Sequence, residues 1–472
     1  MIDEGFQPDF PPEAEQQLES LKADAIAAPD AHLEDLRSMF WSSIDNDTSR
    51  DLDQLEVAER LTEGIRVLIA IADVDSDVSL GSPLDQHAAL ETTSVYTGIR
   101  TFPMLPERLS TDLTSLNQDA DRMAVVVDMT IAADGSIRSG GIYRALVRNR
   151  AQLTYNGVGP WLEGRADPPP KITASPDLAA QLRLQDEAAQ AMLLARQLKG
   201  ALNIDRVETE ALITDGRVEG ISIRNKNRAT ELIENFMVAA NGVMARTLTD
   251  AKVSSIRRVV RTPERWQRIV DLAARTGDLL PAQPDSGSLS LFLQKRKAAD
   301  PAHYADVSLA VIKLMGPGEY VLSHPGEAGQ IHFALAAQDY THSTAPNRRF
   351  ADLVTQRLIK SVLAKQPPPY TDPQLDAIAK NCTLKEDAAR KVERIMNKRI
   401  AAVALEHRIG ETFAAVVTGV TPKGTFVRVS NPPAEGLLIR GQQGVDVGDQ
   451  FAVKLVSTDP QRGFLDFAKD HS

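Results

Sequence analysis

The chain has 472 residues, of which 43% are hydrophobic, and a formal net charge of −11, a length and composition that suit a globular protein of two or three domains. Its apolar runs are far shorter than the roughly 20 residues that cross a bilayer, and its acidic N-terminus is unlike a secretion signal, so we expect a cytoplasmic protein without a membrane segment. The single cysteine, Cys382, excludes an intrachain disulfide and a cysteine-based zinc site, and the negative charge requires any nucleic-acid site to be local.

The first forty residues are expected to form a short helical N-terminal region. Pro11 and Pro12 are placed to begin a helix, and Ala28-Pro29-Asp30 would break it. We therefore separate residues 1–40 from the body that follows. This segment is too short for a complete barrel domain.

The region 41–405 predicts an α+β body. Apolar runs at 67–74 and 123–131 are typical of strands, whereas 177–201 and 230–246 have the spacing of amphipathic helices. A proline-rich break at 366–369 precedes a further long helix, expected over residues 372–407.

The last segment, 406–472, changes to a strand pattern. Five short apolar runs are separated by turn residues such as Pro422-Lys423-Gly424 and Asn431-Pro432-Pro433, which predicts a small antiparallel five-stranded β-barrel. Several of its phenylalanines must fill the barrel core. Phe426, beside a turn and two residues before Arg428, is our candidate for a surface residue that stacks on a base.

The densest chemical signal is the acidic string from Ile44 to Glu56. Asp45, Asp51 and Asp53 stand at even offsets, so extended portions of the segment would direct them to one face and a bend could bring them together. Such carboxylates repel one another unless a divalent cation binds, and hard oxygen ligands suit Mg²⁺ or Mn²⁺. The cation could activate water and stabilise charge on a phosphodiester.

Two other interpretations of this string remain open. Asp, Asn and Ser favour turns because they bond to their own backbone. Alternatively, the spacing from Asp45 resembles a calcium loop of a calcium-responsive interaction protein, although Arg50 stands where an EF-hand needs glycine.

A second motif, Asp339 to Leu353, predicts a phosphate site. Thr344 could cap a helix opened by Pro346, with Phe350, Leu353 and Val354 on its inner face. Arg348 would then lie in the first turn, where the helix end and the guanidinium together bind a phosphate. Its neighbour Arg349 should point elsewhere.

Together, the strings Ile44 to Glu56, Ser94 to Leu116 and Asp339 to Leu353 resemble the RNase II/RNB family. The segment from Gly410 to Ala468 resembles the S-one type OB domain that binds RNA. The resemblance implies an RNB catalytic domain over residues 41–405 and an OB domain over 406–472. It further implies a magnesium-dependent 3′-to-5′ hydrolytic exoribonuclease that degrades single-stranded RNA to nucleoside 5′-monophosphates and a short terminal oligonucleotide, with Mn²⁺ as a possible alternative cation.

The resemblance also assigns roles to individual residues. Asp45, Asp51 and Asp53 match the first three aspartates of the family's metal-binding string, Gln54 occupies the place of the fourth, and Arg348 matches the arginine that clamps the scissile phosphate. Asn347 and Phe350 replace the commoner isoleucine and tyrosine. The expected RNA contacts are base stacking by Tyr96, contacts with the terminal nucleotide by Tyr155 and Glu234, and a family glutamate–arginine pair at Glu393 and Arg394.

Some of these positions also carry expectations of their own. Tyr96 lies in a polar, glycine-containing loop, where an exposed ring suits stacking. Glu234 is expected on the polar side of its helix, together with Glu231 and Asn241. The neutral Gln54 motivates an alternative from another class, a catalytically inactive RNB-derived protein that only binds RNA. The sequence indicates no stable protein partner.

Overall fold

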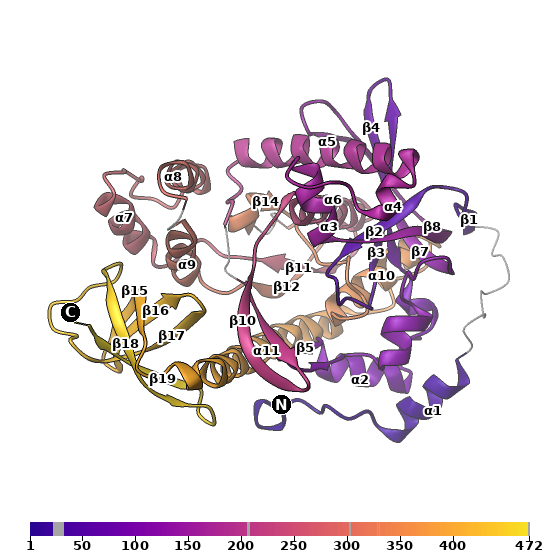
Figure 1. Ribbon diagram of the computed structural model, residues 1–472. Coiled ribbons are helices and arrows are strands. Elements are labelled where there is room, and N and C mark those ends of the chain that lie inside the picture. Colours follow the sequence, from indigo (N-terminus) through magenta and orange to yellow (C-terminus); the bar gives the residue numbers. More distant parts are fainter. Residues whose placement is uncertain (22–32, 205–207, 302–303, 328, 330, 471–472) are drawn as a thin grey trace.

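The computed structural model describes residues 1–21, 33–204, 208–301, 304–327, 329 and 331–470. A large body and a small β-barrel are connected by the long helix α11 (Asp372–Leu405), which runs diagonally between them in Figure 1. Within the described residues, no helix is long and apolar enough to cross a membrane.

The body is built on a six-stranded sheet in the order β1-β8-β2-β3-β4-β7. Its strands are β1 (Leu33–Asp35), β2 (Trp41–Asp45), β3 (Gln54–Leu61), β4 (Gly64–Ala72), β7 (Asp121–Ile131) and β8 (Ile137–Thr154). Because β7 pairs with both β4 and β8, the sheet curls back on itself. The acidic string is thereby placed where β2 ends and β3 begins.

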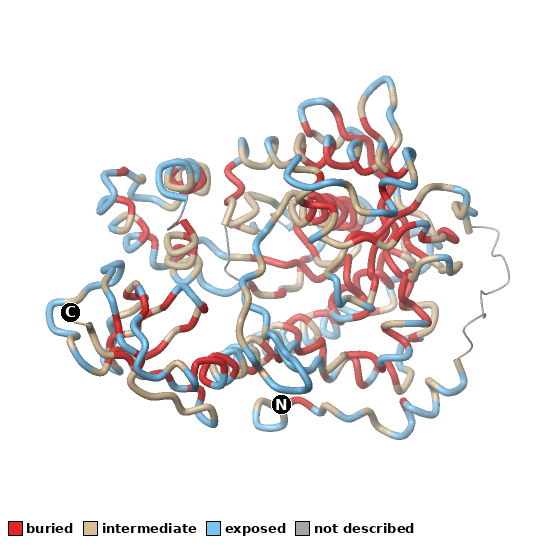
Figure 2. Tube along the Cα trace, viewed as in Figure 1, coloured by how far each residue is buried: buried red, intermediate tan, exposed pale blue. Residues whose placement is uncertain are grey.

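Helices cover the sheet and complete the body's core, which is the most densely buried part of the molecule in Figure 2. They are α1 (Pro12–Ser20), α2 (Pro83–Glu91), α3 (Tyr155–Leu162), α4 (Pro170–Thr173), α5 (Pro176–Leu198), α6 (Arg228–Asp250) and α10 (Phe350–Leu363). Helix α6 begins with a capping box. The Asn227 side chain accepts from the backbone N–H of Thr230, and the Thr230 hydroxyl accepts from the backbone N–H of Asn227.

A second, smaller helical cluster consists of α7 (Trp266–Arg275), α8 (Ser286–Ala299) and α9 (Tyr304–Met315). It has its own apolar core around Trp266, Ile269 and Leu293. Four short hairpins or ribbons complete the body: β5–β6 (Val95–Tyr96, Thr101–Phe102), β9–β10 (Glu208–Thr214, Arg217–Arg224), β11–β12 (Ser255–Val259, Glu319–Ser323) and β13–β14 (Ile331–His332, Ala337–Gln338).

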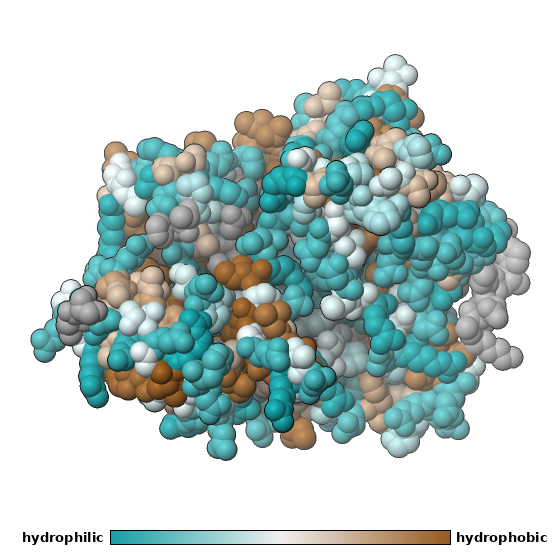
Figure 3. All heavy atoms as spheres, in the orientation of Figure 1, coloured by the Kyte–Doolittle hydropathy of each residue, from teal (hydrophilic) through white to brown (hydrophobic). Residues whose placement is uncertain are grey.

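The C-terminal strands close into a barrel in the order β15-β16-β17-β19-β18. They are β15 (Thr412–Thr421), β16 (Gly424–Ser430), β17 (Pro433–Arg440), β18 (Gln450–Asp459) and β19 (Phe464–Lys469). Ala401, Ala402 and Leu405 at the end of α11 belong to the barrel core, so the helix is packed into both parts. In Figure 3 the surface is largely hydrophilic, with small apolar clusters over the barrel at the lower left.

Most of the predicted elements are confirmed, including the α+β body, the helix start at Pro12, the long helix at 372 and the five-stranded barrel. One detail of the barrel differs from the expectation, because strands β17 and β19 pair in parallel. As expected, phenylalanines such as Phe413 fill the core, although Phe464 is exposed.

The N-terminal region is less helical than predicted. Helix α1 ends at Ser20, and Leu33–Asp35 is a strand that pairs in parallel with Arg144–Leu146 of β8. Pairing with an available edge of the sheet satisfies backbone groups that a short terminal helix would leave unpaired. The expected break at Ala28-Pro29-Asp30 lies outside the described residues.

Candidate active site

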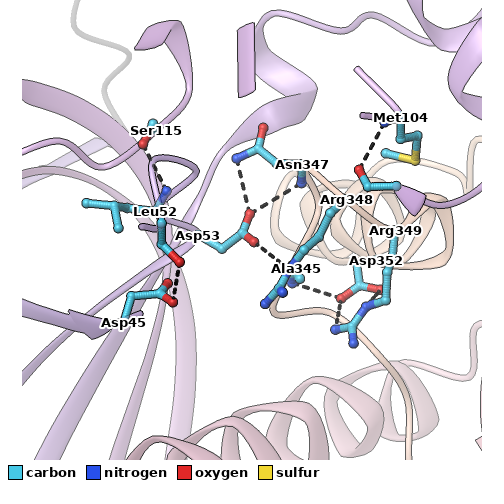
Figure 4. A network of polar contacts seen from close by, with 12 residues as sticks. Asp45, Leu52, Asp53, Met104, Ser115, Ala345, Asn347, Arg348, Arg349 and Asp352 are labelled. Carbon is cyan, nitrogen blue, oxygen red and sulfur yellow. Dashed lines mark hydrogen bonds and ion pairs between the residues drawn. The ribbon is translucent and has the colours of Figure 1, made fainter. Parts of the chain in front are cut away.

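Asp53 lies at the centre of the site, where the segment before β3 meets the turn before α10. Its side chain is buried, with 1% of its surface exposed. Asn347 donates to Asp53 Oδ1 through its side-chain amide at 3.1 Å, and Arg348 Nε donates to Oδ2 at 3.1 Å (Figure 4). Burial raises the pKa of the Asp53 carboxyl to about 7, although the Arg348 charge opposes that shift.

Asp51 and Asp45 lie beside Asp53 but are held differently. Burial raises the pKa of the Asp51 carboxyl, and the charge of Asp45 adds to the effect. Asp45 ends β2, and its Oδ1 accepts from the backbone of Asn46 at 2.7 Å and from Ser49 Oγ at 2.8 Å. The charge of Asp45 thus acts on Asp51, and that of Asp51 on Asp53. The convergence of all three carboxylates on one cation stays a prediction.

Arg348 connects Asp53 with Tyr96. The Tyr96 hydroxyl is hydrogen-bonded to Arg348, and burial raises the pKa of the phenol to about 12. Nevertheless, 40% of the Tyr96 residue surface remains exposed. The ring therefore offers a free surface for stacking while its hydroxyl helps to hold the guanidinium.

The local structure around Arg348 differs from the prediction. Thr344 does not cap a helix, because α10 begins only at Phe350 and its N-cap is Arg349. The carboxylate of Asp352 accepts from the backbone of Ala345 at 2.9 Å and pairs with Arg349 at 2.6 Å, which holds the preceding residues in a turn. Arg348 projects from this turn toward Asp53, so its guanidinium is not in a helical first turn. The expectation that Arg349 points elsewhere is confirmed.

Asn347 is a member of the site that the sequence did not reveal. Besides its contact with Asp53, its Oδ1 accepts from Thr114 Oγ1 at 2.6 Å. The amide therefore fixes the orientation of the Asp53 carboxylate. The only sequence signal for this role is its position directly before Arg348. The sequence alone indicates no more than the replacement of the family's commoner isoleucine by Asn347.

Gln54 is the first residue of β3, opposite Ile71 of β4, and is 5% exposed. Strand alternation places its side chain on the same face as that of Glu56 and opposite to that of Leu55. Whether it binds a cation stays a prediction.

Tyr155 and Glu234 both line the cleft that begins beside Asn46. Tyr155 begins α3 behind the N-cap Thr154, and burial together with the charges of Asp45 and Glu56 raises the pKa of its phenol. Glu234, on α6, pairs with Lys226 at 2.5 Å and with Arg196 at 3.9 Å. In contrast to the prediction, Asn241 of the same helix is buried, because it bonds to Tyr340 and Ser343 in the interior.

Glu393 contacts the loop of Tyr96, and Phe426 lies on the barrel. The Glu393 carboxylate, on α11, accepts from the backbone N–H of Tyr96, and burial raises its pKa. It therefore positions the loop that carries Tyr96. Phe426, between the buried Thr425 and Val427 of β16, is half-buried on the outer face of the barrel, which it shares with Arg428.

A cleft of about 1260 Å³ extends from Asn46 and Tyr155, beside the aspartates, to Arg428 on the barrel. Among the described residues, its charged lining comprises seven cations and three glutamates: Arg224, Lys226, Arg258, Lys313, Arg390, Arg394, Arg428, Glu208, Glu234 and Glu386. The cleft is thus locally basic on a chain whose net charge is −11. A polyanion would be attracted to this surface.

The donor set fits a magnesium or manganese ion. Asp51 and Asp53 are hard oxygen donors whose mutual repulsion a dication would relieve. Among the described residues no group of three or more His, Cys, Asp or Glu side chains is already arranged around a metal position. Mg²⁺ commonly binds through one or two carboxylates, waters and substrate phosphates, so an incomplete protein shell is compatible with it. An EF-hand is excluded, because strands β2 and β3 flank the acidic string.

Comparison with known proteins places this geometry in a family. Residues 33–365 match the RNB domain, and residues 411–470 match the RNase II-type exonuclease C-terminal S1 domain. The chain therefore belongs to the RNB family, with an S1 domain at its C-terminal end.

Several curated relatives are ribonucleases R. The chain is 30% identical to that of Thermotoga maritima, with 97% of this chain and 68% of the relative covered, and 29% identical to that of Escherichia coli, with 91% and 54% covered. Ribonuclease R of Mycoplasma pneumoniae is 30% identical, with 90% and 59% covered. The chain thus spans little more than half the length of several curated relatives that it matches.

Solved structures show the same fold. RNase R of Mycoplasma genitalium in complex with ribose-methylated single-stranded RNA superposes with a TM-score of 0.89 at 24% identity, covering 100% of this chain and 77% of the other. Yeast Ssd1, described as a pseudonuclease, superposes with a TM-score of 0.67 at 17% identity, covering 96% of this chain and 55% of the other.

Proposed function

We propose that the chain is a magnesium- or manganese-dependent exoribonuclease that hydrolyses single-stranded RNA from its 3′ end and releases nucleoside 5′-monophosphates and a short terminal oligonucleotide. The observation that carries the proposal is the buried Asp53, held between Asn347 and Arg348 beside Asp51. The direction of degradation and the products are those that the resemblance to the RNase II/RNB family implies.

Different residues would bind the cation, orient Asp53 and contact the phosphate. Asp51 and Asp53, with Asp45 and Gln54 beside them, would hold the cation, which when bound lowers the pKa of a water and neutralises phosphate charge. Asn347 keeps the Asp53 carboxylate in one orientation. Arg348 directs its guanidinium toward the phosphate whose charge increases during displacement.

The remaining site residues would bind the RNA strand. Tyr155 would pack against the terminal nucleotide, and Glu234 would accept from its ribose hydroxyls, which distinguishes RNA from DNA. Tyr96 would stack on a base nearby, with its backbone held by Glu393. Farther along the cleft, Arg394 would contact a phosphate and Phe426 would offer an aromatic surface on the barrel.

The test is incubation of the purified chain with end-labelled RNA that carries a single-stranded 3′ tail, with Mg²⁺ or Mn²⁺ or with a chelator. We expect successive shortening from the 3′ end and nucleoside 5′-monophosphates, only when a cation is present. A DNA strand of the same sequence is the matched control. Persistence of full-length RNA at every cation concentration would contradict the proposal.

A second candidate is an RNB-derived protein that binds RNA without cleaving it. The neutral Gln54 favours it, since the family's metal-binding string carries an aspartate there. It predicts retention of tailed RNA in a filter-binding assay together with the absence of shortening.

A further inference from the structure

Two histidines on the wall of the cleft have no role in the proposed mechanism. His332 ends the short strand β13, and His342 lies in the segment before Arg348. Both are partly buried, and both line the cleft. Tyr340 packs against both imidazoles, with ring centroids 5.4 Å and 5.7 Å away and ring planes nearly perpendicular to its own. This aromatic packing holds the two rings at fixed angles.

One ring nitrogen of each histidine is already bonded inside the protein. His332 Nδ1 accepts from the backbone N–H of Leu335 at 3.2 Å and so caps the turn Phe333–Leu335. His342 Nδ1 lies 2.8 Å from the Tyr320 hydroxyl. Because that hydroxyl has no other acceptor among the described residues, its proton is donated to Nδ1. A neutral imidazole whose Nδ1 accepts carries its own proton on Nε2.

Both Nε2–H groups remain available as donors in the cleft. Within the described residues neither Nε2 makes a hydrogen bond, although the opposite side of each ring is fixed. Burial, together with the charge of Arg258, lowers the pKa of the His332 imidazole to about 4. Burial and the charge of Arg349 lower the pKa of the His342 imidazole well below its usual range. Both histidines therefore stay neutral near pH 7.

The charges around the two histidines are compensated. Arg258 acts on both imidazoles, and its two Nη atoms donate to the carboxylate of Glu386 on α11. Arg349 is paired with Asp352 at 2.6 Å. Phosphates are attracted more strongly to cations that lack such a partner within the described residues, for example Arg394 of the cleft. The two neutral N–H groups therefore suit an uncharged acceptor of a nucleic-acid strand.

We propose that His332 and His342 donate through Nε2 to ribose 2′-hydroxyl oxygens of an RNA strand in the cleft. The inference rests on the proposed function for RNA as the ligand. An exoribonuclease that shortens a strand step by step must hold any sequence at this position. The 2′ oxygen is present in every ribonucleotide, whereas the acceptor atoms of a base edge differ from base to base. The two histidines thus add affinity that depends on the sugar and not on phosphate charge.

The experiment compares two replacements of each histidine in filter binding of single-stranded RNA by the intact chain, with a chelator present so that no strand is cleaved. The variants His332→Asn and His342→Asn place an amide oxygen near the position of Nδ1, which keeps the internal hydrogen bond, but have no group that reaches the position of Nε2. The variants His332→Gln and His342→Gln place an amide N–H near the position of Nε2 instead. His324→Asn is the matched control, because His324 is exposed and does not line the cleft.

We expect each asparagine variant to bind RNA about fivefold more weakly than the wild type, and the glutamine variants and His324→Asn to stay within about twofold of it. The loss should be equal for poly(A) and poly(U) and absent for a DNA strand. The slope of log affinity against log salt should not change, because a neutral donor releases no counterion.

Three results would overturn the assignment. Wild-type affinity in the asparagine variants would show that Nε2 contacts no RNA. An equal loss in the glutamine variants would show that the histidines only hold the local structure through Nδ1. A loss that is the same for DNA, or that occurs with one homopolymer alone, would mean that the acceptor is a phosphate or a base and not the 2′ hydroxyl.

Failure of this inference can be distinguished from failure of the proposed function, because binding is measured without cleavage. Unchanged RNA binding by the asparagine variants, with RNA degraded by the wild type when a cation is added, overturns the role of the histidines alone. Weaker RNA binding by these variants, with no degradation by the wild type at any cation concentration, supports the contact and contradicts the exoribonuclease.

Discussion

The buried aspartate site around Asp53 and the basic cleft differ in how they hold their charges. In the aspartate site, Asp53 is buried and fixed by two partners before any substrate is present. In the cleft, cations such as Arg394 on α11 remain exposed to solvent. Charge that must act on a reacting atom benefits from burial and fixed orientation, whereas charge that attracts a moving polyanion does not need either.

The largest effect should follow from Asp53→Asn. The change removes a proposed metal ligand but leaves the cleft intact, so hydrolysis should fall on the order of 10³-fold or more while RNA affinity stays near that of the wild type. Single-turnover rates and filter binding measure the two quantities separately. Near-normal turnover would show that the cation binds elsewhere.

Arg348→Ala should have the next largest effect. A guanidinium directed at developing phosphate charge contributes several kcal/mol, so turnover should fall by a factor on the order of 10² or more. Arg348→Lys retains the charge but not the paired geometry and should recover part of the rate. A rate equal to that of the wild type would mean that another group contacts the phosphate.

The pH dependence of cation binding should reveal the burial of Asp53. Its pKa of about 7 means that a proton competes with the cation below neutral pH. The Mg²⁺ concentration for half-maximal rate should therefore fall by about fivefold as pH rises from 6 to 7 and by about twofold more to pH 8, and then level off. A flat profile over this range would contradict the assignment of Asp53 as a ligand.

The same pKa makes a prediction for the metal-free protein. A carboxyl whose pKa is raised on folding stabilises the folded state below its unfolded pKa, and that contribution is lost as pH rises through about 7. With a chelator present at pH 8, Asp53→Asn should therefore melt at a higher temperature than the wild type, and the difference should shrink toward pH 4. Thermal unfolding by circular dichroism measures it.

The smallest effect is expected in the cleft. Arg394→Ala should weaken RNA binding only severalfold and reduce the slope of log affinity against log salt by about 0.7, with the turnover at saturating RNA unchanged. Binding curves at several salt concentrations give the slope. A fall in saturated turnover would show that the cleft takes part in chemistry, and the contrast between the two regions would be lost.

Prediction from the sequence worked best where a local pattern determines the structure. The apolar alternation of 412–469 predicted the five strands of the barrel. These features depend on residues that are close in the chain, so composition and period were sufficient.

It failed where distant residues decide the local structure. Thr344 and Pro346 have the chemistry of a helix start, but Asp352 bonds back to Ala345 and delays the helix to Phe350. Asn347 gained its role only because Asp53, far away in sequence, lies against it. Glu56 could not be recognised as buried without a partner until β2 and α5 were placed around it.

Helix α11 has a consequence for how long an RNA must be. It packs against the Tyr96 loop through Glu393 and into the barrel core through Ala402 and Leu405. The segment of the helix from Glu393 to Leu405, at about 1.5 Å per residue, spans about 18 Å. The length of this helical segment therefore fixes the separation between the barrel and the Tyr96 loop beside the aspartates. A strand shortened below that length would lose the barrel abruptly, at a size set by a helix and independent of base sequence.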